Sequence, residues 1–530
     1  MQTHKLPLSD TGIYGKLMMD YIEGNPALRP FYKYTPSITS IPEIIEDRKQ
    51  FAFHRELLAG ELEDQHRTYF HRFPLLASQI ERIRDENTFT VTTGHQPCLA
   101  GGPMFFIYKL VTTINLSRTL CEKYPDYHFV PVFWLGAEDH DLDEVNHVVI
   151  HGKTIRWQSN QKGATGRMST AGLDVFIEEI REIIGNDALA EQAVSLLKEA
   201  YLSHGNLADA TRAFALALFG EHGLLVLDAD RPALKKVMQG VFHQELALQV
   251  SRQFVDTTSE ELGRTYKIQV TPREINLFYL DDQLRERIVL DEKGHFEVVN
   301  TDLEFTKDFI VDLVDRQPER FSPNVILRPL YQEMILPNLA YIGGPGELAY
   351  WLQLKEMFAQ LQVSYPMLVP RNNALIVPAR ALSKFRQLGF ELKDMFRPYD
   401  TLAKEWLSSQ EDLSDRVEGV KSEVHKMFEQ LSMVFTAVDP TLSPAVMAEA
   451  QKTMNSLDNL MKKGNAALKR KHEVALNQIK LLVDKVNPND QPQERLVNLF
   501  QFYPRHGNAL LDQIITEMTP LSGDMMIIEE

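Results

Sequence analysis

Residues 129–135, Phe-Val-Pro-Val-Phe-Trp-Leu, limit the possible fold more than any other segment, because they are apolar without interruption. A strand with one face in water alternates apolar and polar side chains. An unbroken apolar run of this length is instead typical of a strand whose two faces are both covered. Such strands belong to parallel sheets packed between helices. The segment therefore predicts an α/β fold with a parallel sheet.

The same order of strand, loop and helix is expected at two further places. Residues 89–93 are rich in β-branched side chains, and a loop containing glycine and proline leads from them to the apolar run 104–116. Residues 335–342 have the pattern of a strand, and a glycine-rich loop separates them from an expected helix over 347–361. Successive units of this kind build a parallel sheet, so both segments support the same fold class.

The pattern beyond residue 382 changes to helices. One apolar stripe alternates steps of four and three residues, as in a coiled coil, and a break at Asp439-Pro440 separates it from a second stripe between Met454 and Leu482. We expect the two arms, of about 20 and about 43 residues, to fold back as an antiparallel hairpin. A second copy of the chain could cover the remaining apolar surface, or the hairpin could pack on its own core. The first stripe comprises Val420, Val424, Met427, Leu431, Val434 and Val438.

Charge and cysteine content narrow the classes of function. The chain carries 56 Lys and Arg against 73 Asp and Glu, a formal charge of −17, and such a surface repels nucleic-acid backbones. Its two cysteines, Cys98 and Cys121, lack the CxxC spacing of a zinc or redox site and indicate a reducing compartment. No secretion signal and no apolar run of about 18 residues is evident, so we expect a cytoplasmic protein without nucleic-acid or membrane partners.

The first candidate site is the loop after residues 89–93, which contains Gly94-His95-Gln96-Pro97 and then Gly101-Gly102-Pro103. Glycines let backbone N–H groups approach an anion, and the start of the following helix favours phosphate or carboxylate. We expect His95 to donate a hydrogen bond to a phosphoryl oxygen or to a developing charge. The alternative is a tight turn whose histidine is satisfied by a backbone carbonyl. Neither the GxGxxG nor the GxxxxGK[ST] pattern is present.

The second candidate site is the acidic run 138–144, Glu-Asp-His-Asp-Leu-Asp-Glu, which has five acids in seven positions. Because no basic residue is nearby in the sequence, these carboxylates would repel one another unless an ammonium group, a metal ion or solvent neutralises them. If the chain is helical from Asp141 onward, His140, Glu144 and His147 lie on one face and could ligate a metal. A solvated first helical turn is the alternative.

A third candidate site follows residues 335–342. The loop Gly343-Gly344-Pro345-Gly346, with Glu347 at the start of the next helix, repeats the pattern of the first loop. If the two loops are neighbours in the sheet, they would form the walls of one cleft together with the acidic run. Arg371, after a further expected strand, could bind a carboxylate or phosphate through two parallel hydrogen bonds.

These motifs together resemble the BshC family of bacillithiol biosynthesis. The resemblance is carried by residues 93–97, Gly102-Pro103, the long acidic motif 131–147 and residues 343–350, and it covers the whole chain. It implies a Rossmann-like core similar to class I nucleotidyl-transferases, connecting insertions, and a coiled coil that pairs two subunits as a homodimer. The HxGH and KMSKS signatures of class I synthetases are absent, so the position of a nucleotide stays open.

The resemblance also implies a ligase that adds L-cysteine to the amine of glucosaminyl-malate and so forms bacillithiol. A free carboxylate and an amine do not readily form an amide, so we expect ATP with Mg²⁺ to activate cysteine, and no tightly bound cofactor. A metal-dependent hydrolase using His140, Glu144 and His147, or a non-catalytic coiled-coil scaffold, are the alternatives. The residues expected in catalysis are His95, Asp139, His140 and Asp141; those expected to bind substrates or nucleotide are Gly94, Gln96, Gly101, Gly102, Pro103, Glu138, Asn146, Gly343, Gly344, Gly346, Glu347 and Arg371.

The domain organisation follows from the same patterns. The expected parts are the first part of the Rossmann-like core over residues 1–156, connecting insertions of mixed helix and strand over 157–319, the second part of the core over 320–381, the helical coiled-coil hairpin over 382–500, and a tail over 501–530 that packs on the core.

Overall fold

The computed structural model describes residues 1–411 and 413–530. Their contacts divide the chain into two compact units. The first unit comprises Pro7–Ala374 and Gln493–Met526, and the second comprises Met1–Leu6, Leu375–Pro492 and Ile527–Glu530. No helix in the described residues combines the length with the apolar run that a membrane crossing requires.

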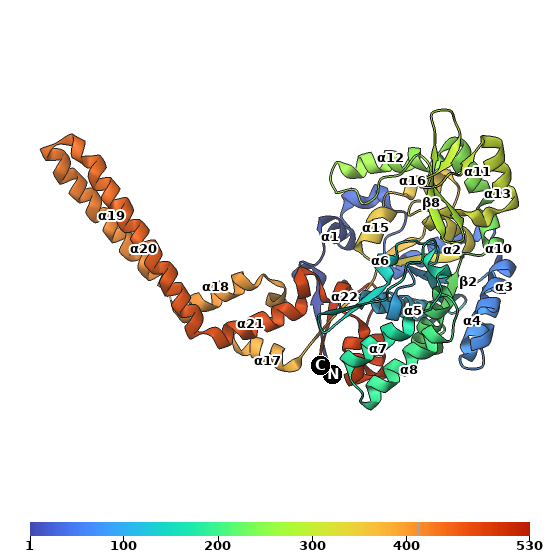
Figure 1. Cartoon of the computed structure of the whole chain (residues 1–530), viewed down its shortest axis with the longest axis horizontal. Coiled ribbons are helices and arrows are strands. Elements are labelled where there is room, and N and C mark those ends of the chain that lie inside the picture. Colours follow the sequence, from blue (N-terminus) through green and yellow to red (C-terminus); the bar gives the residue numbers. More distant parts are fainter. Residues whose placement is uncertain (412) are drawn as a thin grey trace. The chain divides into compact units, whose positions relative to one another are not determined.

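A five-stranded parallel sheet forms the centre of the first unit, and helices surround it (Figure 1). The strand order is β13-β12-β2-β3-β6. Counted along the chain this is 5-4-1-2-3, the order of a Rossmann-like sheet, so the predicted fold class is confirmed. The order reverses between β2 and β12, and ligands bind in the crevice at such a reversal. The strands are β2 (Thr88–His95), β3 (His128–Leu135), β6 (Leu225–Asp228), β12 (Asn338–Gly343) and β13 (Met367–Pro370).

The central strands are covered on both faces, as the apolar run predicted. The seven residues of β3 from Phe129 onward are all buried, and so are the first seven of β2. Helix α5 (Phe105–Lys123) contacts both strands and contributes Leu116 and Leu120 to a core cluster shared with α2 (Ile41–Lys49). Burial of successive residues on one strand requires packing partners on both sides, so the layered core positions the strand ends firmly.

The boundaries around β12 differ from the prediction. The expected strand over 335–342 starts later, because α14 (Arg328–Ile335) includes Ile335 and Pro337 then separates the helix from β12. The expected helix over 347–361 is two shorter helices, α15 (Pro345–Trp351) and α16 (Lys355–Gln360).

The segment expected as connecting insertions also contributes to the core, because β6 lies within 157–319 and pairs with β3. The remainder of that segment supplies four strands of an antiparallel sheet with the order β10-β9-β8-β7-β11, whose fifth strand, β11, lies in the part predicted as core over 320–381. Its strands are β7 (Leu277–Asp281), β8 (Leu284–Leu290), β9 (Phe296–Val298), β10 (Glu304–Phe305) and β11 (Phe321–Pro323).

The other elements of the first unit surround these two sheets. They are α1 (Lys16–Ile22), α3 (Arg55–His66), α4 (Pro74–Ile83), α6 (Leu142–Val145), the hairpin of β4 (His147–Ile150) and β5 (Lys153–Arg156), α7 (Leu173–Ile184), α8 (Ala188–Leu202), α9 (Leu207–Phe219), α10 (Pro232–Lys235), α11 (Gln239–Leu248), α12 (Val250–Gly263), α13 (Lys307–Arg316), α22 (Gln493–Leu496), α23 (Tyr503–His506) and α24 (Asn508–Glu517).

The second unit combines a small sheet with helices. Its three strands have the order β1-β15-β14, which brings both chain ends together. On β15, Glu529 Oε1 lies 2.6 Å from His4 Nε2 of β1 and 3.0 Å from Nη1 of Arg386. The elements are β1 (Gln2–Pro7), β14 (Asn373–Val377), β15 (Asp524–Glu529), α17 (Ala379–Gln387), α18 (Tyr399–Gln410), α19 (Leu413–Val438), α20 (Ser443–Lys471) and α21 (Glu473–Val486).

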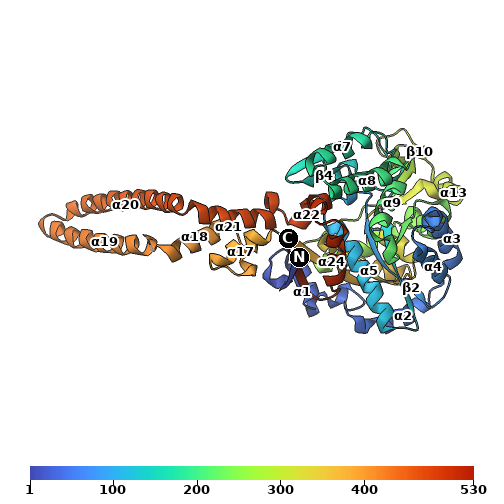
Figure 2. The same ribbon diagram turned by 90° about the horizontal axis from the view of Figure 1, so that it is seen from below.

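Helices α19 and α20 lie side by side as a hairpin (Figures 1 and 2). The hydroxyl oxygens of Ser432 and Ser443 are 2.8 Å apart near the turn, and Lys421 Nζ lies 2.5 Å from Asp458 Oδ1 at a greater distance from the turn. The helices are therefore antiparallel, as predicted. The second arm is shorter than expected: α20 has 29 residues, and the helix breaks at His472. Beyond the break, α21 packs on α17 and α18.

The predicted apolar stripe on α19 does not face α20. Val424 is half-buried, whereas Met427 is 58% exposed, Val434 is 64% exposed and Val438 is 80% exposed. A neighbouring stripe that includes Val417 and Phe428 is the half-buried one. Sequence spacing shows which residues share a face of the helix but not which face meets the partner helix. The predicted stripe was therefore the wrong one for the contact with α20.

A buried ion pair joins α2 to α14 beneath the sheet. The side chains of Arg48 and Glu333 contact each other and are both 0% exposed, and burial lowers the pKa of Arg48 to about 9. Glu333 also accepts a hydrogen bond from Asn338 at 2.7 Å, and Asn338 accepts one from Thr92 at 2.8 Å. The network therefore fixes the start of β12 beside β2.

We expect Arg48→Met to lower the free energy of unfolding of the first unit by about 3–5 kcal/mol, because it leaves the Glu333 carboxylate buried without a counter-charge. Urea unfolding of the full chain measures this loss. The double variant Arg48→Met/Glu333→Met should lose less, because no buried charge remains. A single variant as stable as the parent would contradict this account.

Candidate active site

The carboxyl ends of all five parallel strands open into one cavity of about 760 Å³ in the first unit. Its position follows from the register: His95, Leu135 and Asp228 are paired neighbours at the same edge of the sheet. The loops near His95 and Gly344 and the acidic run around Asp139, predicted to meet, all line this cavity. The lining residues from these strand ends include Gly94, His95, Gln96, Gly136, Glu138, Asp139, His140, Asp230, Gly344, Gly346, Glu347 and Arg371.

His95 is a neutral imidazole at this edge. Its Nδ1 lies 3.0 Å from the carbonyl oxygen of Gln96, and its ring packs against Phe105 and Phe106. Burial, helped by the charge of Lys109, lowers the pKa of His95 to about 4. Since Nδ1–H donates to a carbonyl, Nε2 carries a lone pair and accepts hydrogen bonds. The expectation that His95 donates to a phosphoryl oxygen does not match this tautomer; the alternative turn geometry does.

The side-chain amide of Gln96 joins the first loop to the acidic run. Its Nε2 donates to Asp139 Oδ2 at 2.7 Å and to Glu144 Oε2 at 2.6 Å. An amide nitrogen has two N–H donors, so one residue satisfies an oxygen of each carboxylate. Gln96 thereby holds two like charges close together at the cavity wall.

Arg285, on β8, supplies a cation to the acidic run. Its Nη1 donates to His140 Nδ1 at 2.7 Å and lies 3.8 Å from Asp139 Oδ1. A guanidinium group can only donate, so His140 Nδ1 must accept and the proton of this ring is on Nε2. Burial lowers the pKa of Arg285 to about 10. Sequence reasoning missed Arg285, because nothing in the local pattern of β8 separates it from a surface charge.

Glu138, in the same acidic run, also has a cationic partner far along the chain that the sequence did not reveal. Its carboxylate contacts the ammonium group of Lys235, which is 0% exposed and also donates to the carbonyl oxygen of Phe321 at 2.7 Å. Burial lowers the pKa of Lys235 well below its ordinary value. The acidic run is therefore neutralised in part by basic residues from far along the chain.

Lys109 ties the two glycine-containing loops together. Its ammonium group donates to the carbonyl oxygen of Gly94 and to Glu347 Oε2, the latter at 2.6 Å. Glu347 also accepts hydrogen bonds from Tyr341 at 2.6 Å and from the backbone N–H of Gly344 at 2.9 Å. Burial alone would raise the pKa of Glu347, but Lys109 and these hydrogen bonds outweigh it and lower that pKa. Glu347 is thus an ionised link across the crevice.

Arg371 is buried at the end of β13 and already has an anionic partner. It forms a bidentate pair with Glu494, with distances of 2.7 and 3.0 Å. Asn373 donates to the same carboxylate at 2.8 Å. Within the described part of the chain Arg371 Nε is buried and has no hydrogen-bond partner, while the residue as a whole lines the cavity.

Several predicted residues lie outside the cavity lining. Gly101, Gly102 and Pro103 are packed against the segment around Asn498, which donates to the carbonyl oxygen of Gly102 at 2.6 Å. An anion cradle from this part of the loop is therefore not supported. Gly343, the last residue of β12, is buried and does not line the cavity. Asp141 and Asn146 line a smaller adjoining pocket of about 620 Å³, which shares Asp139, His140 and Glu144 with the main cavity.

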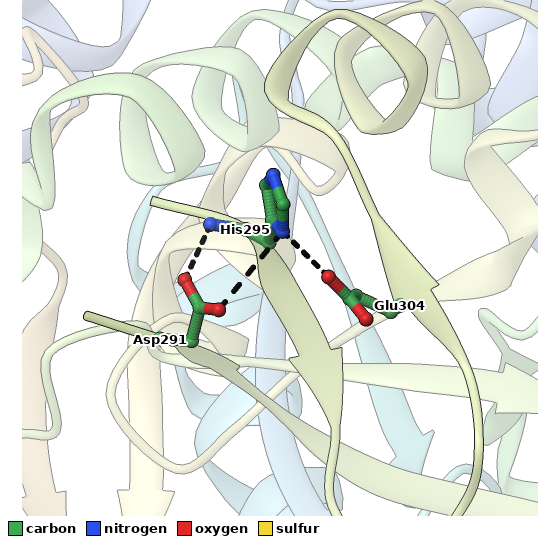
Figure 3. A group of neighbouring side chains, drawn as sticks. All are labelled: Asp291, His295 and Glu304. Carbon is green, nitrogen blue, oxygen red and sulfur yellow. Dashed lines mark hydrogen bonds and ion pairs between the residues drawn. The ribbon is translucent and has the colours of Figure 1, made fainter. Parts of the chain in front are cut away.

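The alternative in which a helix from Asp141 onward carries a metal site is not supported by the structure. α6 has only four residues, and His147 already belongs to β4, where its Nδ1 faces the carbonyl oxygen of Asp143 at 3.0 Å. His140, Glu144 and His147 therefore do not share one helical face. Across residues 1–411 and 413–530, potential metal ligands gather instead at Asp291, His295 and Glu304 beside the β8–β9 turn (Figure 3). There Asp291 accepts backbone hydrogen bonds that close the turn.

The cavity is more basic than the chain as a whole. Seven basic side chains and five acidic ones line it, although the chain has a net charge of −17. Such a mixed lining suits small molecules that carry both carboxylate or phosphate groups and amines. The basic residues are Lys109, Arg273, Arg285, Arg287, Arg328, Arg371 and Arg495; the acidic ones are Glu138, Asp139, Glu144, Asp230 and Glu347.

Comparisons with known proteins match both units of the chain. Residues 1–372 match the family model described as "Bacillithiol biosynthesis BshC, N-terminal Rossmann-like domain", and residues 374–530 match "Bacillithiol biosynthesis BshC, C-terminal coiled-coil domain". A Flavobacterium psychrophilum protein named "Putative cysteine ligase BshC" is 40% identical, with 100% of both chains covered. A Bacillus thuringiensis protein of the same name is 27% identical over 97% of this chain and 98% of its own length.

We expect the free energy of unfolding to fall as the pH is lowered from about 6.5 to 4, in part because of His95. In this range the unfolded chain binds a proton at His95 that the folded chain does not bind, which contributes at most about 1.4 kcal/mol per pH unit. His95→Asn should make the decline shallower in urea unfolding at several pH values. His71→Asn, at an exposed position, is the control. Equal slopes for the parent and His95→Asn would refute the assignment.

Proposed function

Because the chain belongs to the BshC family, the cysteine ligases of bacillithiol biosynthesis, we propose that it joins the carboxyl group of L-cysteine to the amine of glucosaminyl-malate and so forms bacillithiol. The observation that carries this proposal is the mixed-charge cavity at the strand ends. Its volume of about 760 Å³ is within the range for substrate-sized ligands. Its arginines suit carboxylates and phosphates, and its acids suit amines.

The chemistry requires activation of the cysteine carboxylate, and we assign this to ATP with Mg²⁺. The cysteine carboxylate attacks a phosphorus atom of ATP and displaces ADP or pyrophosphate, which gives an acyl phosphate or an adenylate; the glucosamine nitrogen then attacks the carbonyl carbon, the C–N bond forms, and phosphate or AMP leaves with the C–O bonding pair. The nitrogen loses a proton in the same step. Lys109 and Arg371 provide positive charge for the phosphates, and Glu144 provides carboxylate oxygens of the type that Mg²⁺ prefers.

Among the acids, Asp139 is our candidate for accepting this proton. Glu138 is paired with Lys235, and Asp141 lies outside the main cavity, where it caps α6. Asp139 lines the cavity, and its only cationic neighbour of fixed charge in the described residues, Arg285, lies 3.8 Å away. A carboxylate in this position can accept a proton from an attacking amine.

The second unit supports a homodimer. Residues of the predicted stripe on α19 are exposed in the single chain, among them Met427, Leu431 and Val434 at 58%, 43% and 64%. A second hairpin with the same stripe would cover them in a symmetric contact.

We place the protein in the cytoplasm, because Cys98 and Cys121 are both free thiols.

In cells that lack this gene we expect glucosaminyl-malate to accumulate and bacillithiol to be absent, because the amide-forming step is missing. Mass spectrometry of thiol-labelled extracts measures both compounds. Restoring the gene should restore bacillithiol. Normal bacillithiol in the deletion strain would overturn the proposed function.

We expect Asp139→Asn to lower kcat of the purified enzyme about 100- to 10,000-fold, because an amide cannot accept the proton from the attacking amine. Steady-state formation of bacillithiol from glucosaminyl-malate, cysteine and ATP measures the loss. Asp143→Asn, which changes an exposed acid of the same run, is the matched control and should keep the parent rate. A fully active Asp139→Asn enzyme would remove Asp139 from the proposed mechanism.

We expect Leu431→Glu to convert the dimer into a monomer, because it buries a charge in the proposed contact between two hairpins. Light scattering after gel filtration should give a mass near 60.8 kDa for the variant and twice that for the parent. Ser422→Glu adds the same charge at an exposed position away from the stripe and should remain dimeric. A dimeric Leu431→Glu variant would exclude this contact.

A further inference from the structure

Arg328 stands at the reversal point of the sheet, between β2 and β12. It is the first residue of α14 and lines the cavity. Its Nη1 donates to Gln332 at 3.0 Å and its Nη2 donates to the hydroxyl of Tyr350 at 3.3 Å. The guanidinium carbon lies 5.7 Å from the centre of the Tyr341 ring. These contacts hold the guanidinium in one orientation at the crevice where a Rossmann-like sheet binds its ligand.

Arg328, which is half-buried, differs from the buried cations of the cavity because it has no carboxylate partner at ion-pair distance within the described chain. Lys109 is paired with Glu347, and Arg371 is paired with Glu494. Arg285 has Asp139 at 3.8 Å. For Arg328, in contrast, no carboxylate oxygen of the described residues lies within the 4.0 Å of an ion pair, and its neighbours are neutral amide and phenol groups.

Burial alone would lower the pKa of Arg328, but Tyr350, Tyr341 and Glu347 outweigh it and raise that pKa. Glu347 lies beyond ion-pair distance, so an anionic ligand can supply the direct counter-charge. A guanidinium group has five N–H donors, and Arg328 uses two of them in the contacts above. The other donors can form a bidentate, charge-assisted pair with a carboxylate or a phosphate. Arg328 therefore has both the positive charge and the free N–H donors that binding of an anion requires.

Gly94 makes room for this side chain. A Cβ atom at position 94 would lie 3.5 Å from Arg328 Nη1 and 3.3 Å from the hydroxyl of Tyr341. The backbone of Gly94 has no positive φ angle, so the glycine is not needed for a turn. Its missing side chain instead keeps the space between the end of β2 and the guanidinium open.

We propose that Arg328 anchors an anionic oxygen group of a substrate, a carboxylate or a phosphate, in the crevice between β2 and β12. The proposal rests on the ligase function and adds a binding residue to it. It also gives Gly94 a role, since close approach of the anion to Arg328 requires the space that this glycine leaves.

The kinetic test replaces Arg328 by Gln and by Lys in the full chain. We expect Arg328→Gln to raise KM for one substrate about 10- to 100-fold with kcat changed less than about threefold, because one charge-assisted pair is lost. Arg328→Lys should have an intermediate KM, since an ammonium group cannot bind in bidentate fashion. A raised KM for glucosaminyl-malate or cysteine identifies a carboxylate, and a raised KM for ATP identifies a phosphate. Unchanged KM values with a reduced kcat would overturn the proposal.

Arg320→Gln is the matched control. Arg320 donates to the hydroxyl of Tyr279 at 3.3 Å, and its guanidinium carbon lies 5.8 Å from that ring, an arrangement similar to Arg328 with its tyrosines. Unlike Arg328, it is paired with Asp281 and does not line the cavity. Arg320→Gln should keep all three KM values.

A binding test separates this proposal from the ligase function. Titration calorimetry with malate and with inorganic pyrophosphate needs no turnover. The parent should bind at least one probe, and Arg328→Gln should bind it at least tenfold more weakly, whereas Arg320→Gln should not. Gly94→Ala is a second variant that leaves Arg328 in place but narrows its space, and it should also weaken binding.

The possible results are distinct. Weaker binding by Arg328→Gln in a protein that makes no bacillithiol would keep the anchor and reject the ligase function. Equal binding of both probes by the parent, Arg328→Gln and Gly94→Ala would reject the anchor, even if the ligase assay succeeds. Absence of binding to either probe by the parent would also reject it.

Discussion

The link from Lys109 to Gly94 and Glu347 is the interaction on which the cavity depends. Strands β2 and β12 are paired up to Thr93 and Ile342, and the cavity begins where the two strands leave this pairing. Lys109, buried on α5, joins the carbonyl oxygen at the end of β2 to the carboxylate at the start of α15. Because that carboxylate also accepts hydrogen bonds from Tyr341 and from the Gly344 backbone, one ammonium group links the end of β2 to the loop after β12.

Charge around this crevice is balanced over long sequence distances. Glu138 is paired with Lys235, the Asp139 and His140 pair meets Arg285, and Arg371 is paired with Glu494. The protein therefore pairs the buried cations of the cavity, Lys109, Arg285 and Arg371, with carboxylates, which reduces the desolvation cost. Among the cavity cations that are not exposed, half-buried Arg328 is the exception, and its lack of a carboxylate partner at ion-pair distance in the described residues is what makes it informative about the ligand.

The parts of the site that sequence reasoning found are those with a local signal. Gly94, Gln96, Asp139 and Gly344 were recognised because strand, glycine loop and helix follow one another along the chain, and because parallel strands end at the same edge of a sheet. Gly101, Gly102 and Pro103 had the same local signal but pack against Asn498, nearly 400 residues later. The helix expected from Asp141 onward also had a local signal, yet it ends after four residues where β4 begins.

By itself the sequence determined the layered α/β core, the edge of the sheet that carries the site, and the antiparallel hairpin, because apolar periodicity and glycine placement act over a few neighbouring residues. Only the tertiary structure decided which cations meet the acidic run, which tautomers His95 and His140 adopt, and which stripe of α19 faces α20. These properties depend on contacts between residues such as Arg285 and His140, or Arg371 and Glu494, that are more than 100 positions apart. No spacing rule links such residues, since the folded backbone alone sets their distance.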